Sequence, residues 1–148
     1  MRAWSRILVV AAAVSTWGCD ESLKDIAGPS PTLTPSFASI QAEIFEATDS
    51  SGRAACVQCH TNVGRTPPAG LNLTHDAAYA ALVGVPSVGK AGAVRVVPGD
   101  PDNSYLIHKL EGRSTIVGQR MPRTGGPFLT EGQMMIIKRW ITEGAANN

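Results

Sequence analysis

The feature that most constrains this chain is the pentapeptide at residues 56–60, where two residues separate Cys56 from Cys59 and His60 follows at once. Residues three positions apart lie on the same side of a helical turn, so both thiols can reach one group while the imidazole stands beside them. Such a thiol pair serves proteins as a redox-active disulfide, as half of a zinc site or as the attachment point of haem. Each use makes a different demand on the rest of the chain.

The surrounding sequence favours the third use. A thioredoxin-type pair stands at a helix start in a βαβ unit, whereas strand patterns here are confined to residues 94–97. A zinc site needs further ligands, but there is no second cysteine pair, and His75 and His108 lack finger spacing. The order C-x-x-C-H is the attachment signal of c-type haem. We therefore expect one covalent haem c on Cys56 and Cys59, with His60 as an axial ligand of its iron.

Composition agrees with a small domain folded around a rigid group. The chain has 148 residues, enough for one domain, and its 17% charged residues and net charge of +1 exclude a disordered chain and a strongly basic nucleic-acid binder. Aromatic residues make up only 5%, beside 15 glycines and 10 prolines, which predicts a small aliphatic core and long loops. A bound cofactor makes such loops compatible with a compact domain.

The first 18 residues are typical of an export signal, because Arg2 and Arg6 precede an apolar run at residues 7–14. That run is too short to cross a bilayer, which takes about 20 residues. Residues 15–19 resemble a bacterial lipobox, which predicts a lipid on Cys19 and an anchor on the periplasmic face of a bacterial membrane. The alternative is ordinary cleavage nearby, which leaves Cys19 as a free thiol on a soluble periplasmic protein.

Three segments follow from these patterns: an export signal at residues 1–18, a flexible tether at 19–35 and a folded domain at 36–148. The tether mixes charges with Pro, Ser and Thr and has no apolar periodicity. Within the domain, Ser36 is a good N-cap, Asp100 before Pro101 is a strong helix start, and Thr130 with Gln133 forms a capping box. We predict four short helices, within residues 36–48, 74–82, 103–110 and 130–144.

Taken together, these pieces resemble the class I c-type cytochromes, more narrowly the single-haem domains of secreted bacterial proteins, over about residues 36–146. The segments that carry the resemblance are residues 56–60, 69–73, 97–106, 120–122 and 140–145. The resemblance implies an all-α, cytochrome c-like fold, with four short helices and long loops around one covalent haem. It also implies crossed N- and C-terminal helices and one-electron transfer as the activity.

The second axial ligand is expected to be Met121. It follows His60 by 61 residues, is followed by Pro122 and precedes the last helix, which is where the distal ligand lies in the family. Met134 and Met135 fall in a predicted helix, where packing is the commoner role of methionine. Two histidines are the remaining alternatives. His75 is expected to face solvent in the first turn of a helix, and His108 is expected to lie on a short helix as a hydrogen-bonded or partly exposed residue.

The resemblance also suggests supporting residues. A backbone carbonyl at residues 66–68, Pro67 first, is expected to accept a hydrogen bond from the second ring nitrogen of His60. Leu71 and Leu73 either line the haem edge or belong to the core. Five arginines are candidates to pair with a haem propionate: Arg65, Arg95, Arg113, Arg120 and Arg123.

Ligation by His60 and Met121 raises the reduction potential and leaves the iron no open position. We therefore expect an electron carrier that exchanges single electrons with redox protein partners, rather than an enzyme or a nucleic-acid binder. Two alternatives stay open at this point. The chain could be the haem subunit of a membrane redox complex, or a ligand-binding sensor or enzyme if Met121 does not bind the iron.

Overall fold

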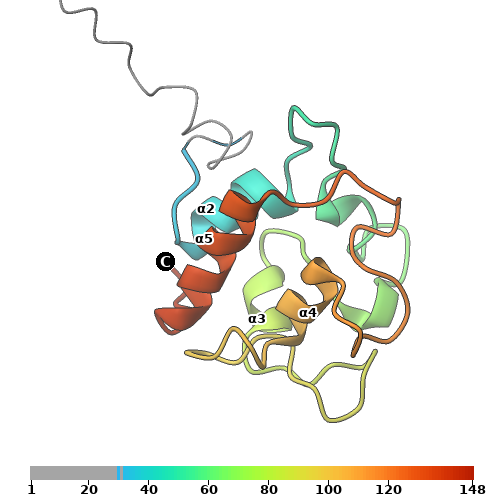
Figure 1. Cartoon of the computed structure of the whole chain (residues 1–148). Coiled ribbons are helices and arrows are strands. Elements are labelled where there is room, and N and C mark those ends of the chain that lie inside the picture. The colour runs from blue at the N-terminus through green and yellow to red at the C-terminus, as the bar shows by residue number, and fades with distance from the viewer. Residues whose placement is uncertain (1–29, 31) are drawn as a thin grey trace, which may run out of the picture.

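The computed structural model describes residue 30 and residues 32–148, so the predicted export signal and Cys19 lie outside the described residues (Figure 1). Its elements in chain order are α2 (Phe37–Ile40), the π-helix η1 (Gln41–Phe45), the 3-10 helices η2 (Cys56–Gln58) and η3 (Pro68–Gly70), α3 (Ala78–Leu82), α4 (Tyr105–Glu111) and α5 (Glu131–Thr142). Extended pairing in this part of the chain consists of isolated bridges within residues 83–104. None of the helices described is long and apolar enough to cross a membrane.

Helices form in all four predicted segments, and two of the predicted caps are present. The Ser36 hydroxyl accepts a hydrogen bond from the Ser39 amide at the start of α2. At α5, the Thr130 hydroxyl accepts from the Gln133 amide while the Gln133 side chain accepts from the Thr130 amide. These reciprocal bonds satisfy two amides that the first turn of a helix leaves without partners.

The two middle helices begin later than predicted. The Asp100 carboxylate accepts from the Asn103 amide at 3.0 Å, which closes a separate turn before Ser104 opens α4. The Thr74 carbonyl likewise accepts from the amides of residues 77 and 78, and only then does α3 begin. In the first case the predicted capping side chain forms a local turn in place of the helix start.

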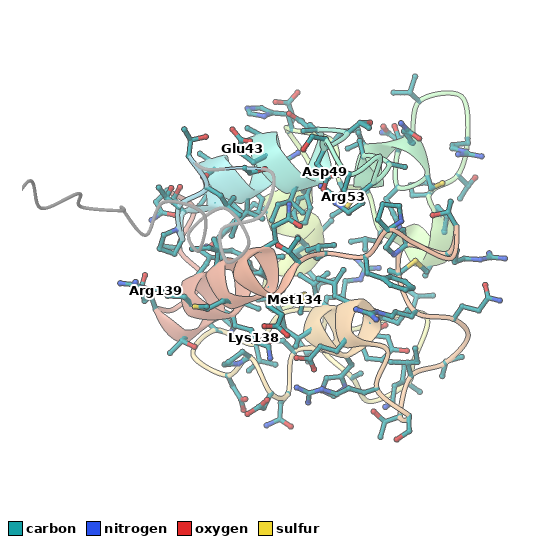
Figure 2. All side chains as sticks on the ribbon, turned by 45° about the horizontal axis from the view of Figure 1, so that its top comes forward. Glu43, Asp49, Arg53, Met134, Lys138 and Arg139 are labelled. Atoms are coloured by element: carbon teal, nitrogen blue, oxygen red, sulfur yellow. The ribbon has the colours of Figure 1, made fainter. Side chains whose placement is uncertain are left out.

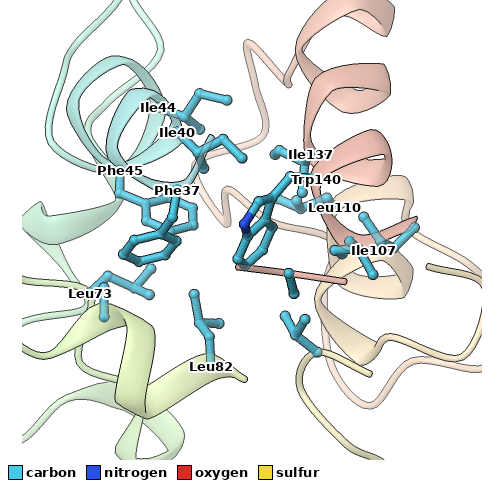
Figure 3. Close-up of a cluster of buried hydrophobic side chains, with 14 of the residues drawn as sticks. Phe37, Ile40, Ile44, Phe45, Leu73, Leu82, Ile107, Leu110, Ile137 and Trp140 are labelled. Atoms are coloured by element: carbon cyan, nitrogen blue, oxygen red, sulfur yellow. The ribbon is translucent and has the colours of Figure 1, made fainter. Parts of the chain in front are cut away.

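The core forms where α2 and α5 lie side by side (Figure 1). Phe37 faces Trp140 with 5.5 Å between ring centroids, and only 1% of Trp140 is exposed (Figure 3). The C-terminus closes this packing, because the Asn148 carbonyl accepts from the Ala38 amide and its side chain accepts from the Phe37 amide. The other large buried apolar residues are Ile40, Ile44, Phe45, Leu73, Leu82, Val96, Tyr105, Ile107, Leu110, Leu129, Met134, Ile137 and Ile141.

The last residues of the predicted tether belong to the domain. Leu33 is partly buried against the core, and the Thr34 amide donates to the Ser39 hydroxyl at 2.9 Å. The Thr32 hydroxyl also donates to Glu43. The packed domain therefore begins a few residues before position 36.

A buried ion pair fixes the chain between η1 and η2 (Figure 2). Arg53 Nε lies 3.0 Å from Asp49 Oδ2, and the two side chains are 1% and 3% exposed. Arg53 Nη1 also donates to the Ile44 carbonyl at the end of η1. Burial raises the pKa of Asp49, but hydrogen bonds from Ser51 and Arg53 and the Arg53 charge together hold it below 3.8. The ionised pair thus ties η1 to the segment that enters η2.

The substitution Asp49→Asn should lower the free energy of unfolding by about 3 kcal/mol, because it leaves the buried Arg53 guanidinium without its counter-charge. Urea unfolding near neutral pH measures this change. Glu143→Gln, which breaks the exposed pair of Glu143 with Arg139, is the control and should have a much smaller effect.

The effect of Asp49→Asn should also depend on pH. Because the pKa of Asp49 is lower in the folded than in the unfolded chain, its stabilisation is complete above 3.8 and is lost as the pH falls below that value. The stability difference between wild type and variant should therefore shrink in acid. A difference that stayed constant down to about pH 2 would contradict the ion pair.

Candidate functional site

The two cysteines and His60 lie on one tight turn formed by η2. The amides of Cys59 and His60 both donate to the Cys56 carbonyl, at 3.2 and 2.9 Å. Both thiols are free; Cys59 is exposed, while Cys56 is half-buried with its Sγ 3.6 Å from the Ile44 carbonyl. Burial raises the pKa of the Cys56 thiol, more than the nearby Arg53 lowers it. The turn therefore offers two thiols, one of them open to solvent, beside one imidazole.

His60 is held from both its ring and its backbone by the segment that follows η3. Its Nδ1 lies 3.2 Å from the Leu71 carbonyl, and its own carbonyl accepts from the Leu73 amide at 2.8 Å. A carbonyl can only accept, so Nδ1 carries the proton and Nε2 is the nitrogen left for a metal ion. Burial lowers the pKa of His60 below 6.5, which favours the neutral, ligating form.

The expected partner of His60 was the Pro67 carbonyl, and this detail is wrong in the structure. The Pro67 carbonyl instead accepts from the Gly70 amide at 3.0 Å and closes η3. The proline pair thus shapes the turn that carries Leu71 past the imidazole ring. Leu73 is 3% exposed and belongs to the core, whereas the half-buried Leu71 borders it.

Met121 lies on the long segment between α4 and α5, which runs beside η2 and η3 (Figures 1 and 2). It is partly buried against the core, and its amide donates to the Lys109 carbonyl at 2.9 Å. The Lys109 ammonium is close enough to His60 to contribute to lowering its pKa. His60 and Met121, which are far apart in sequence, are thus both linked to Lys109, His60 through the lysine charge and Met121 through a hydrogen bond.

The other sequence candidates for the second ligand are buried in the core, exposed, or in contact with other groups. Met134 is buried in the core and Met135, on the same helix, is 56% exposed. His75 is exposed, with Nδ1 3.7 Å from a Glu46 carboxylate oxygen. His108 Nε2 lies 2.6 Å from the Asp102 carbonyl. These positions favour Met121.

Apolar side chains around the turn suit a flat hydrophobic group. Nine apolar residues border the core while remaining partly exposed, and they include Cys56 and Val57 of the turn together with Leu71, Leu106 and Met121. A macrocycle placed against them would cover apolar surface that now faces solvent. Two free thiols, an imidazole with one nitrogen held, and a thioether form a donor set that fits a covalent haem.

The five candidate arginines differ in their surroundings. Arg113 pairs with Asp102 and Glu111, the Arg120 guanidinium lies over the Phe128 ring, and Arg65 and Arg123 are exposed. Arg95 alone among them is buried: its guanidinium donates to the carbonyls of Ala69 and Ala81, at 2.8 and 2.7 Å. Among the described residues it has no carboxylate within ion-pair distance. It is therefore the best-placed candidate for a propionate.

Sequence reasoning missed two residues that support the site. Lys109 contacts the segment before Met121, and Arg53 lies buried near Cys56. A lysine on a short helix is normally solvated, so its identity alone carried no signal. The four-residue spacing of Asp49 and Arg53 is only a weak signal of a buried pair, because pairs with this spacing usually lie on exposed helix surfaces.

Within residues 30 and 32–148, no group of three or more His, Cys, Asp or Glu side chains is placed to hold a metal ion. The donors described above, one imidazole and one thioether, are a different kind of set. Compared with protein-family models, curated proteins and solved structures, the chain has no match.

Proposed function

We propose that this protein is a periplasmic monohaem c-type cytochrome, lipid-anchored through Cys19, that transfers single electrons between redox protein partners. The observation that carries the proposal is the η2 turn, where two free thiols adjoin an imidazole whose Nδ1 is held by the Leu71 carbonyl. This arrangement suits covalent attachment at both thiols and leaves Nε2 of His60 for iron.

Each site residue has a defined task in this proposal. Cys56 and Cys59 would form the thioether bonds, and the His60 nitrogen and the Met121 sulfur would bind the iron. The group they bind supplies a one-electron Fe(III)/Fe(II) couple. Thioether ligation favours Fe(II) relative to a second imidazole, so the potential is expected to be relatively high. With both residues bound to the iron, the chain would act as a carrier rather than as a catalyst.

The protein surroundings support electron transfer in two further ways. Three partly exposed apolar residues, Val57, Leu71 and Leu106, would exclude water from the haem that covers them. Fewer solvent molecules would then have to reorient when an electron is transferred. The buried guanidinium of Arg95 supplies a positive charge for a propionate, because its bonds to carbonyls leave that charge uncompensated.

Absorption spectra of the haem-loaded protein, for wild type and Met121→Ala, test the ligand assignment. Wild type should show the ferric methionine–iron charge-transfer band and refuse carbon monoxide in the ferrous state. Met121→Ala should lose the band and bind carbon monoxide, because one axial position is then open. Met135→Ala, which removes an exposed methionine, is the matched control and should leave both properties unchanged.

If wild type binds carbon monoxide readily and Met121→Ala changes nothing, the iron is open and a ligand-binding sensor or enzyme takes the place of the carrier. A wild-type protein that carries no covalent haem when produced with haem-maturation machinery would contradict the proposal altogether.

The distribution of charge supports a partner with an acidic surface. Residues 57–73, 84–99 and 112–130 contain no Asp or Glu, and contacts join them: Arg95 binds the Ala69 carbonyl and Lys90 the Thr115 carbonyl. In the part of the chain that is described, the cations without a carboxylate partner all lie in these loops or on α4. They are Arg65, Lys90, Arg95, Lys109, Arg120 and Arg123.

Electron exchange with small ions should reveal this charge. The rate with hexacyanoferrate(III), an anion, should fall as ionic strength rises, while the rate with a hexaammineruthenium cation should rise. Arg65→Glu should slow the first reaction roughly twofold to fivefold at low salt. Arg139→Glu on α5 is the control and should have little effect. Equal sensitivity of the two variants would argue against a localised cationic surface.

A further inference from the structure

The loop that carries Met121 has almost no hydrophobic anchorage. None of the residues from 112 to 125 is fully buried, and Val117 is 59% exposed. Apolar burial is what normally holds a long loop in one conformation. The position of this loop must therefore come from polar contacts, and α4 provides them.

One residue of α4, Lys109, makes three of these contacts. Its Nζ donates to the carbonyls of Val117, at 3.0 Å, and Gln119, and its own carbonyl accepts from the Met121 amide at 2.9 Å. The three contacts fall on alternate residues of the loop, the last of them being the expected ligand itself. We call this arrangement the Lys109 clasp.

The partners of Lys109 distinguish the clasp from an ordinary stabilisation of a helix end. A lysine in the last turn commonly interacts with the carbonyls of its own helix, whereas the Lys109 ammonium binds carbonyls of the following loop. It has no carboxylate partner among the residues that the structure describes. Its side chain is therefore committed to the loop.

We propose that Lys109 is a positioning residue that holds the Met121 loop so that the thioether would bind the haem iron. This inference rests on the proposed haem function and deepens it. With the clasp intact the loop keeps one conformation and the iron is closed to small ligands. Without it the carbonyls of Val117 and Gln119 lose the ammonium that binds them, and the closed site becomes an open one.

The decisive experiment compares three variants of the full haem-loaded chain. Lys109→Leu keeps an apolar stem on the helix but removes the donors, and Lys109→Arg keeps charge and donors. Lys90→Leu is the matched control, because Lys90 Nζ also donates to a carbonyl of this loop, at Thr115, farther from Met121. The readouts are the ferric methionine–iron band, carbon monoxide binding in the ferrous state and the thermal unfolding midpoint.

Lys109→Leu should lose most of the band and gain carbon monoxide affinity by roughly tenfold to a hundredfold, the effect of removing hydrogen bonds from a charged donor. Lys109→Arg should restore the band, and Lys90→Leu should keep it. If Lys109→Leu does not accumulate, Lys109→Gln is the second variant and should show the same direction.

Two results would overturn the clasp: a Lys109→Leu protein with an unchanged band that still refuses carbon monoxide, or a Lys90→Leu protein that loses the band equally. A loss of thermal stability with the band retained would assign Lys109 a purely structural role and would also overturn it. Failure of the proposed function is distinguishable, because the wild-type protein itself would then lack haem or lack the band.

Discussion

The hydrogen bond between His60 Nδ1 and the Leu71 carbonyl is the interaction on which the rest of the site depends. It selects one tautomer, in which Nδ1 carries the proton and Nε2 is the nitrogen that can bind a metal ion. The bond exists because η3 turns the chain back and because the Leu73 amide closes on the His60 carbonyl. Local turn chemistry thus determines where an iron ligand points.

The two proposed axial ligands are held by different physical means. His60 follows a segment fixed by a buried ion pair and adjoins the core residue Leu73. Met121 is partly buried on a loop whose residues 112–125 include no fully buried side chain, and hydrogen bonds from α4 hold that loop. Contacts exposed to solvent open more readily than packed ones. Movement at this site is therefore expected on the methionine side. Gly112 restrains the start of the loop: it has a left-handed backbone, with φ of 72°, and a Cβ at this position would stand 2.8 Å from the Arg120 Cδ.

Sequence patterns predicted the elements better than the contacts between them. Caps such as Ser36 and Thr130 act within three residues, so their geometry is written locally and both formed as predicted. The carbonyl that binds His60 was expected at Pro67 because proline holds its backbone rigidly, but which carbonyl meets the ring depends on the path of η3. Lys109 had no local signal, since its role comes from a loop that begins after its helix ends. The haem attachment, the ligand Met121 and the lipid on Cys19 remain predictions from sequence.

A formal net charge of +1 suggests a chain without electrostatic preference, yet the two signs are distributed differently over its surface. Within residues 32–148, acidic residues occur at 43–49, at 76, at 100–111, at 131 and at 143, while the loops around the site contain none. An approaching partner responds to the local potential within about 10 Å, not to the sum over the chain. Haem propionates would neutralise part of the cationic surface, and Arg95 is the buried residue placed to receive one. The remaining cations lie at the surface, where they favour contact with an acidic partner.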